Sequence, residues 1–440
     1  MAQKRLLLLL ASISILAFSC TKDPDPDPVP VQNKRAVLVY MAADNNLYGD
    51  AFNNINELES AWKDSYEGKI YVLLNPPKKG TTYAKRQPGY SDATYDETTR
   101  LLEIVADSDM KVVASKELKN YGSTANPCLG SFFSQVIADT RSLAQAETYG
   151  VVMWSHGSGW LPQEQAAAAG ISPNLLTRDD GSPLTRSFTQ HPVTNEIVPM
   201  SFGSILSYSD RMDVDVLAGA LPADITLDFI IFDACYMGCV EVAYELRNKA
   251  KYTVMSTCEV LARGIPYDNI VGELMVAQSS LTSGLSSLAQ KNYQYFNEMT
   301  YEAYRLCSMA VIDNEKLDAV AAAVKNITSN YPKTISDVPR TTIQDFGYGS
   351  YRKIFYDLGD FVARTWPGAG AELAQFEQAM EDIIVVKYNC STILGTYPIN
   401  TFSGLSAYIM DPSQTYFVGV YKDASRFAWG TDTGLADMPW

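Results

Sequence analysis

Short apolar runs alternate with helix-like stretches along the first two thirds of this chain. The apolar runs are rich in β-branched and aromatic residues and occupy residues 36–41, 70–74, 151–154, 227–232 and 252–255. Unbroken runs of this kind are typical of strands that are covered on both faces. The helical patterns that separate them include residues 51–62, 129–143 and 240–248. This alternation predicts an α/β fold in which a mostly parallel sheet is flanked by helices on both faces.

The domain organisation is read from the places where this pattern changes. Residues 161–212 carry several glycines and prolines with little periodicity, which indicates an irregular insertion. Later segments read as helical at residues 288–306 and 316–326 and as strand-like at residues 383–386 and 403–410. We therefore expect a main domain over residues 34–285 and a smaller C-terminal α/β subdomain over residues 286–440.

The N-terminus has the pattern of a targeting segment. Lys4 and Arg5 precede an apolar run, residues 6–18, that is too short to span a membrane comfortably. We therefore interpret residues 1–19 as a signal peptide. The last residues of the run resemble a bacterial lipobox, which would make Cys20 the lipidated first residue of the mature chain. The alternative is ordinary cleavage near Ser19.

An acidic linker of alternating Asp and Pro follows Cys20, within residues 20–33. Such a sequence forms neither helix nor sheet and should stay extended. An acidic stretch in this position resembles the signal that sends some bacterial lipoproteins outward. We expect the protein at the outer membrane or cell surface, with the N-terminal lipid anchor as its one membrane contact.

Charge and cysteine content exclude several classes of function. Asp and Glu number 50 against 35 Lys and Arg, a formal net charge of −15, which argues against nucleic acid as a partner. A chain of 440 residues needs no disulfide staples, so the six cysteines beyond Cys20 are expected to be mostly free. With two histidines and no paired Cys-x-x-Cys motifs, the sequence shows no metal ligand set and no cofactor site.

Two of the predicted strands end on residues that can carry chemistry. His156 follows the run 151–154, and Cys235 follows the run 227–232, each with a glycine close behind. Ligands bind at the carboxyl ends of strands in open α/β sheets, so both side chains are expected at the same edge. A cysteine nucleophile needs a nearby base because the thiolate is the form that attacks. The other histidine, His191, falls in the irregular segment and reads as surface loop.

A structural interpretation competes with this one. A single histidine beside an apolar strand is usually a hydrogen-bonded structural residue, and a single cysteine in such a run is usually part of the core. Their joint occurrence at two strand ends makes the catalytic interpretation equal in weight to the structural one.

The residues around His156 and Cys235 carry a specific resemblance. Residues 156–160 (HGSGW) and 233–238 (DACYMG) resemble the catalytic histidine and cysteine motifs of the clostripain family of peptidases. That family shares its fold with caspases, legumains and gingipains. Further similar segments are residues 40–47, 241–246 and 403–408, so the resemblance covers roughly residues 35–410.

The resemblance implies a cysteine endopeptidase that cuts protein or peptide substrates after Arg or Lys. We expect the protein to be a monomer. Cys235 would attack the scissile carbonyl, and His156 would protonate the leaving amine. The backbone N–H groups of Gly157 and Cys235 would hold the oxyanion. Asp233 would line the pocket for the basic side chain, with a structural carboxylate at the turn as the alternative. Calcium dependence occurs in the family, but the sequence shows no convincing ligand cluster.

Some features leave specificity and activation open. In residues 257–267, Glu259 and Gly264 fit the family pattern, but the family's tryptophan is absent and Arg263 is unexpected. A related peptidase with non-basic specificity is therefore an alternative. Another is a non-catalytic surface lipoprotein that binds host or glycan ligands. Self-cleavage between the catalytic residues occurs in the family, and Arg178 and Arg186 are the sites to consider first.

Overall fold

The computed structural model describes residues 33–161, 189–190, 197–198, 212–347 and 353–440. These lie within one compact unit, Asn33–Trp440. The predicted signal peptide, Cys20, and the candidate cleavage sites Arg178 and Arg186 lie outside the described residues. Within the described part, no helix combines the length and the apolar character that crossing a membrane requires.

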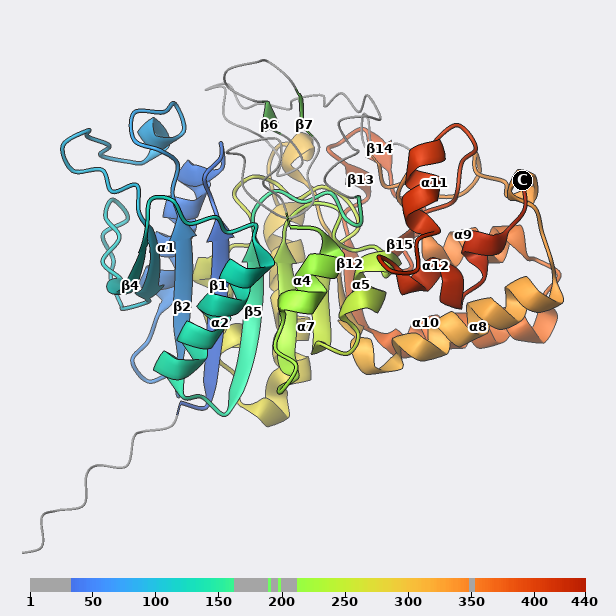
Figure 1. The fold of residues 1–440 in the computed structure, drawn as a ribbon, viewed down its shortest axis with the longest axis horizontal. Coiled ribbons are helices and arrows are strands. Elements are labelled where there is room, and N and C mark those ends of the chain that lie inside the picture. Colours follow the sequence, from blue (N-terminus) through green and yellow to red (C-terminus); the bar gives the residue numbers. More distant parts are fainter. Residues whose placement is uncertain (1–32, 162–188, 191–196, 199–211, 348–352) are drawn as a thin grey trace, which may run out of the picture. The chain divides into compact units, whose positions relative to one another are not determined.

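A nine-stranded sheet forms the centre of the unit, in the order β12-β10-β9-β8-β5-β1-β2-β3-β4 (Figure 1). The five inner strands β9, β8, β5, β1 and β2 pair in parallel. The two outer strands on each side pair antiparallel. The strand bounds are β1 Arg35–Ala42, β2 Gly68–Asn75, β3 Thr99–Glu103, β4 Lys116–Gly122, β5 Thr148–Trp154, β8 Leu227–Asp233, β9 Ala250–Ser256, β10 Ser308–Asp313 and β12 Ile384–Asn389.

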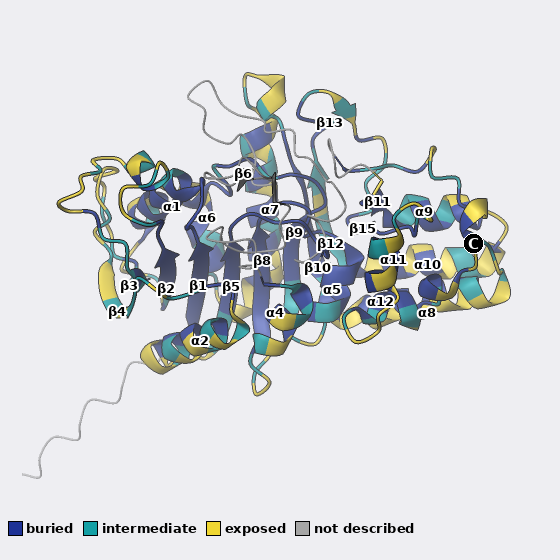
Figure 2. Ribbon diagram, turned by 45° about the horizontal axis from the view of Figure 1, so that its top comes forward, coloured by how far each residue is buried: buried dark blue, intermediate teal, exposed yellow. Residues whose placement is uncertain are grey.

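The inner five strands are the five apolar runs of the sequence, so the predicted α/β fold is confirmed. Their burial explains the lack of alternation, because almost every residue of β1, β2 and β8 is buried. Figure 2 shows these strands as a buried layer between more exposed helices.

Helices cover both faces of the sheet (Figures 1 and 2). One face carries α1 (Tyr48–Ala61), α6 (Tyr267–Leu274) and α7 (Leu281–Asn297), and the other carries α2 (Gly130–Ala144), α4 (Val214–Ala220) and α5 (Val240–Leu246). Strand–helix–strand units in a parallel sheet are right-handed, so chain segments that run in opposite directions along the sheet place their helices on opposite faces. Here β1-α1-β2 runs one way and β8-α5-β9 the other.

The last third of the chain contributes both to the sheet and to a group of helices. Strands β10 and β12 extend the central sheet, and the predicted subdomain boundary near residue 286 stays a prediction. Of the strand-like run at residues 403–410, only Ser406–Ala407 (β15) pairs, and the helix predicted at 288–306 is α7, which ends at Asn297.

The remaining elements are short or peripheral. They are α8 Leu317–Asn330, α9 Leu358–Thr365, α10 Gly370–Ile383, α11 Thr415–Tyr421, α12 Ala428–Asp432, β6 Thr189–Gln190, β7 Ile197–Val198, β11 Tyr356–Asp357, β13 Thr392–Ile393 and β14 Tyr397–Pro398, with 3-10 turns at Ala84–Arg86, Gln278–Ser280, Glu302–Tyr304, Asn314–Lys316, Ile335–Asp337 and Leu435–Asp437.

Candidate active site

Strands β5 and β8 end side by side and bring the two motifs together. Their parallel register pairs Trp154 with Asp233, and His156 and Cys235 each follow two residues later. A Cβ added to Gly157 would lie 2.4 Å from the carbonyl oxygen of Cys235 and 3.0 Å from its nitrogen. Only a glycine allows this approach of two backbones. The predicted oxyanion donors, Gly157 and Cys235, are therefore neighbours, and their role as donors stays a prediction.

A third strand supplies the hydrogen-bond partner of His156. The imidazole is fully buried, and its Nε2 lies 2.8 Å from Oδ1 of Asn46. Asn46 follows β1, which pairs with β5 on the side away from β8. Because an amide oxygen can only accept, Nε2 donates, and in the neutral ring the basic lone pair is then on Nδ1.

Asn46 has no role assigned in the sequence analysis, although it lies in one of the family-like segments, residues 40–47. Its position just after a buried strand is the same signal that singles out His156 and Cys235. What the sequence lacked was the order of the strands, which places β1 directly beside β5.

The Cys235 side chain is also fully buried and contacts the segment between β9 and α6, residues 257–266, which we call the β9–α6 loop. The backbone N–H of Val260 donates to Sγ at 3.0 Å. The thiol in turn donates to the carbonyl oxygen of Val260 at 3.5 Å, so both backbone polar groups of Val260 hold the Cys235 side chain in place.

The turn after Cys235 is strained. Tyr236 adopts φ 60°, a left-handed conformation that a bulky residue rarely takes, and its ring stacks on Phe355 at 4.8 Å with an interplanar angle of 11°. Backbone strain of this kind persists where the surroundings hold it in place, and it gathers at functional sites.

Asp233 links β8 to the β9–α6 loop. Its carboxylate is buried and accepts from the N–H of Ile265 at 3.3 Å and from the hydroxyl of Tyr267 at 3.0 Å. These contacts fit the structural interpretation of Asp233 and also fix the loop beside Cys235. Its contact with a substrate side chain stays a prediction.

No disulfide or metal cluster is found in the described part of the chain. The cysteines at 128, 235, 239, 258, 307 and 390 are all buried, and none of them forms a disulfide. Groups of three or more potential ligands from His, Cys, Asp and Glu do not occur among the described residues.

The comparison with known families decides the classification. The model of the clostripain family matches residues 39–186 and 206–416, a span that includes both His156 and Cys235. The chain belongs to the clostripain family. The resemblance seen in the two motifs is thereby confirmed, and so is its extent along the chain.

The individual relative that we compare has a low sequence identity to this chain. The clostripain of Hathewaya histolytica is 27% identical over 248 residues, which are 54% of this chain and 41% of that protein. The match thus spans about two fifths of the relative's length.

Solved structures share the fold across nearly the whole chain. An inactive zymogen C11 protease from Parabacteroides distasonis gives a TM-score of 0.69 at 24% identity, covering 92% of this chain and 99% of that one. A secreted C11 cysteine protease from Bacteroides thetaiotaomicron gives 0.67 at 23% identity, covering 91% and 99%.

Proposed function

We propose that this protein is a cysteine endopeptidase that cuts after Arg or Lys, with Cys235 as nucleophile and His156 as its base. The observation that supports this most directly is the parallel register of β5 and β8, because the two motifs follow these strands at the same edge of the sheet. Membership of a family of cysteine proteases supports it independently.

In the proposed mechanism, His156 accepts the thiol proton of Cys235, and the thiolate attacks the scissile carbonyl. The imidazolium then protonates the leaving amine, and water hydrolyses the acyl-enzyme. Asn46 holds the ring orientation through Nε2. Backbone N–H groups of Gly157 and Cys235 would stabilise the oxyanion, each worth on the order of 3 kcal/mol.

Basic specificity is proposed to reside in Asp233. A carboxylate two residues before the nucleophile complements a guanidinium or ammonium group. The resemblance of residues 233–238 to the cysteine motif of the clostripain family motivates this choice.

Activation by self-cleavage at Arg178 or Arg186 is part of the proposal. The side chains of His156 and Cys235 are both fully buried, so a substrate reaches the sulfur only after covering residues are displaced. One relative of the same fold is described as an inactive zymogen. We also propose that the protein is exported and lipidated at Cys20. Metabolic lipid labelling of the unsubstituted protein that is lost in Cys20→Ala would support this.

The test of the catalytic proposal uses residues 21–440, which contain the compact unit, and fluorogenic peptides ending in Arg, Lys, Asn or Ala. Cleavage after Arg or Lys that is lost in Cys235→Ala and His156→Ala supports the proposal. Cysteine-dependent cleavage after Asn or Ala would keep the dyad and remove Asp233 as the basic pocket. Silence on all peptides, before and after limited proteolysis and with or without calcium, would favour a binding protein on a peptidase fold.

A further inference from the structure

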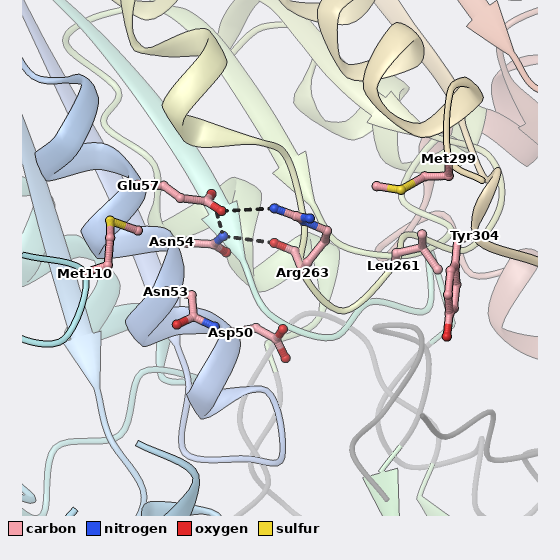
Figure 3. A pocket seen from close by; sticks show the side chains of 9 residues that line it. All are labelled: Asp50, Asn53, Asn54, Glu57, Met110, Leu261, Arg263, Met299 and Tyr304. Atoms are coloured by element: carbon pink, nitrogen blue, oxygen red, sulfur yellow. Dashed lines mark hydrogen bonds and ion pairs between the residues drawn. The ribbon is translucent and has the colours of Figure 1, made fainter. Parts of the chain in front are cut away.

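A cavity of about 550 Å³ opens between α1 and the β9–α6 loop (Figure 3). One wall is polar and comes from one face of α1, where residues at helical spacing point the same way. The opposite wall is largely apolar and comes from the loop and the segment after α7. The lining residues are Asp50, Asn53, Asn54, Glu57, Met110, Leu261, Arg263, Met299 and Tyr304.

Both walls continue directly from segments that touch the catalytic pair. Asn46, which contacts His156, lies four residues before Asp50 on the cavity wall. Val260, which contacts Cys235, immediately precedes Leu261 on the other wall. The cavity is therefore formed by segments that hold His156 and Cys235, and its lining includes neither of these residues nor Asp233.

One ion pair joins the two walls. The guanidinium of Arg263 lies 3.2 Å from Oε1 of Glu57 and stacks over the ring of Tyr295, with Cζ 4.6 Å from the ring centroid. Asn54 donates to Oε2 of Glu57 at 3.1 Å and to the carbonyl oxygen of Arg263 at 2.9 Å. With Asp50 on the same wall, the cavity carries two carboxylates and one guanidinium.

The positive charge of Arg263 only partly offsets the burial of Glu57. Burial raises the pKa of Glu57 to about 7, while Arg263 acts in the opposite direction. The negative charge of Asp268, at the start of α6, raises the pKa of Glu57 further. Asp50 adds negative charge on the face of α1 that carries Glu57. A second cation in the cavity would favour the ionised carboxylate.

The chemistry of the cavity matches a long basic side chain. Apolar side chains of Met110, Leu261 and Met299 suit the aliphatic stem of Lys or Arg, whose charged head can reach the carboxylates. An acidic side chain would meet the two carboxylates and is disfavoured by like charge.

We propose that this cavity is a substrate subsite for a second basic side chain, one that flanks the residue bound at Asp233. The inference rests on the proposed peptidase function and deepens it, because the enzyme would prefer substrates with two basic residues near the cut. Glu57 and Asp50 are its specificity-determining residues.

The experiment uses activated protein of residues 21–440 and peptides with one fixed Arg at the cut. A second residue, Lys or Gln, is placed in turn at each flanking position on both sides, and kcat/KM is measured for each Lys/Gln pair. The variants are Glu57→Gln and Asp50→Asn. Glu67→Gln, an exposed position in the turn before β2, is the matched control.

At one flanking position, Lys should exceed Gln by roughly tenfold, and each pocket variant should reduce that ratio at least threefold. The ratio should also rise between pH 6 and pH 8 as Glu57 ionises, and this rise should be lost in Glu57→Gln. Glu67→Gln should behave as the unsubstituted protein does. A ratio near one at every position in the unsubstituted protein, with Arg cleavage intact, would overturn the subsite but not the peptidase.

Two other results separate the failures. If Glu57→Gln slows the cleavage of all peptides with Arg at the cut equally, whatever the flanking residue, the cavity binds the residue at the cut and the inference is wrong. If no peptide is cleaved and no thiol-directed peptide inhibitor labels Cys235, the proposed function itself fails.

Discussion

Gly157→Ala tests whether the close approach of β5 and β8 sets the geometry of the catalytic pair. The new Cβ would lie 2.4 Å from the carbonyl oxygen of Cys235, 3.0 Å from its nitrogen and 2.9 Å from the Cβ of Ala234. Two of these three atoms belong to the backbone, so no side-chain rotation relieves the clash. Ordinary contact between such atoms needs about 3.5 Å, and the two segments must separate by roughly 1 Å.

The displacement should affect catalysis more than stability. Overpacking of this kind typically costs about 1–3 kcal/mol of unfolding free energy, which a chain of this size should survive folded. A misplacement of about 1 Å between reacting groups can reduce the rate roughly 100-fold. We therefore expect Gly157→Ala to lower kcat/KM for the best Arg or Lys peptide by about two orders of magnitude.

Urea unfolding and peptide hydrolysis, measured on the same preparations, separate the two effects. Gly219→Ala in α4 is the matched control, because nothing lies within 4 Å of its added Cβ. It should keep full activity and gain up to about 1 kcal/mol of stability from helix propensity. A folded Gly157→Ala variant with unaltered kcat/KM would refute the idea that this contact positions Cys235 against His156.

Three further substitutions address the orientation of His156, the buried charge network and a buried acid. Asn46→Ala removes the acceptor of His156 Nε2 and should lower kcat roughly 10–100-fold with little change in KM. Asn46→Asp keeps an acceptor and should retain more activity. Equal kcat in the two variants would contradict a positioning role. Asp228→Asn removes the charge of the carboxylate that binds buried Arg35, and it should lower the unfolding free energy in urea by about 3 kcal/mol. Asp318→Asn breaks an exposed ion pair with Arg247 and should change that free energy by no more than about 0.5 kcal/mol. Burial raises the pKa of Glu241 to about 7, so the folded state binds its proton more tightly than the unfolded state, and stability should fall as pH rises from about 4 to about 7. Glu241→Gln keeps the acceptor for the N–H of Tyr408 and should be more stable than the unsubstituted protein by about 2–3 kcal/mol at pH 8. The difference in stability should be small at pH 5. An equal difference at both pH values would contradict the raised pKa of Glu241.

The sequence predicts the five inner strands of the sheet but misses three of the four outer ones, β3, β4 and the buried β10. Each of the five inner strands is an unbroken apolar run, because helices cover the sheet on both sides. Strand β4 escapes prediction since it lies at the edge of the sheet, has no buried residue and reads as polar. The short strand β3 lies between β2 and β4 and carries only two consecutive apolar residues, Leu101 and Leu102.

The placement of His156 and Cys235 at the same end of the sheet could be predicted from a rule that needs no strand order. Parallel strands present their carboxyl ends at one edge, which places His156 and Cys235 on the same side of the sheet. That they are also neighbours follows from the pairing of β5 with β8. The partner of His156 does depend on the order. In the sequence, α1, β2, β3, β4 and α2 separate Asn46 from β5, and only the pairing of β1 with β5 brings Asn46 to the imidazole.

The proposed second subsite depends on a still longer-range relation. Glu57 and Arg263 are 206 residues apart, and neither has a spacing or neighbour in the sequence that connects it with the other. Arg263 departs from the family pattern in the sequence, yet in the fold it compensates a carboxylate buried on α1. The departure from the family pattern therefore does not argue against basic specificity, because Arg263 faces Glu57 and its charge is neutralised within the wall. Arg263 lines the cavity proposed for the flanking residue, so this residue of the substrate, more than the residue at the cut, should respond to the charges there.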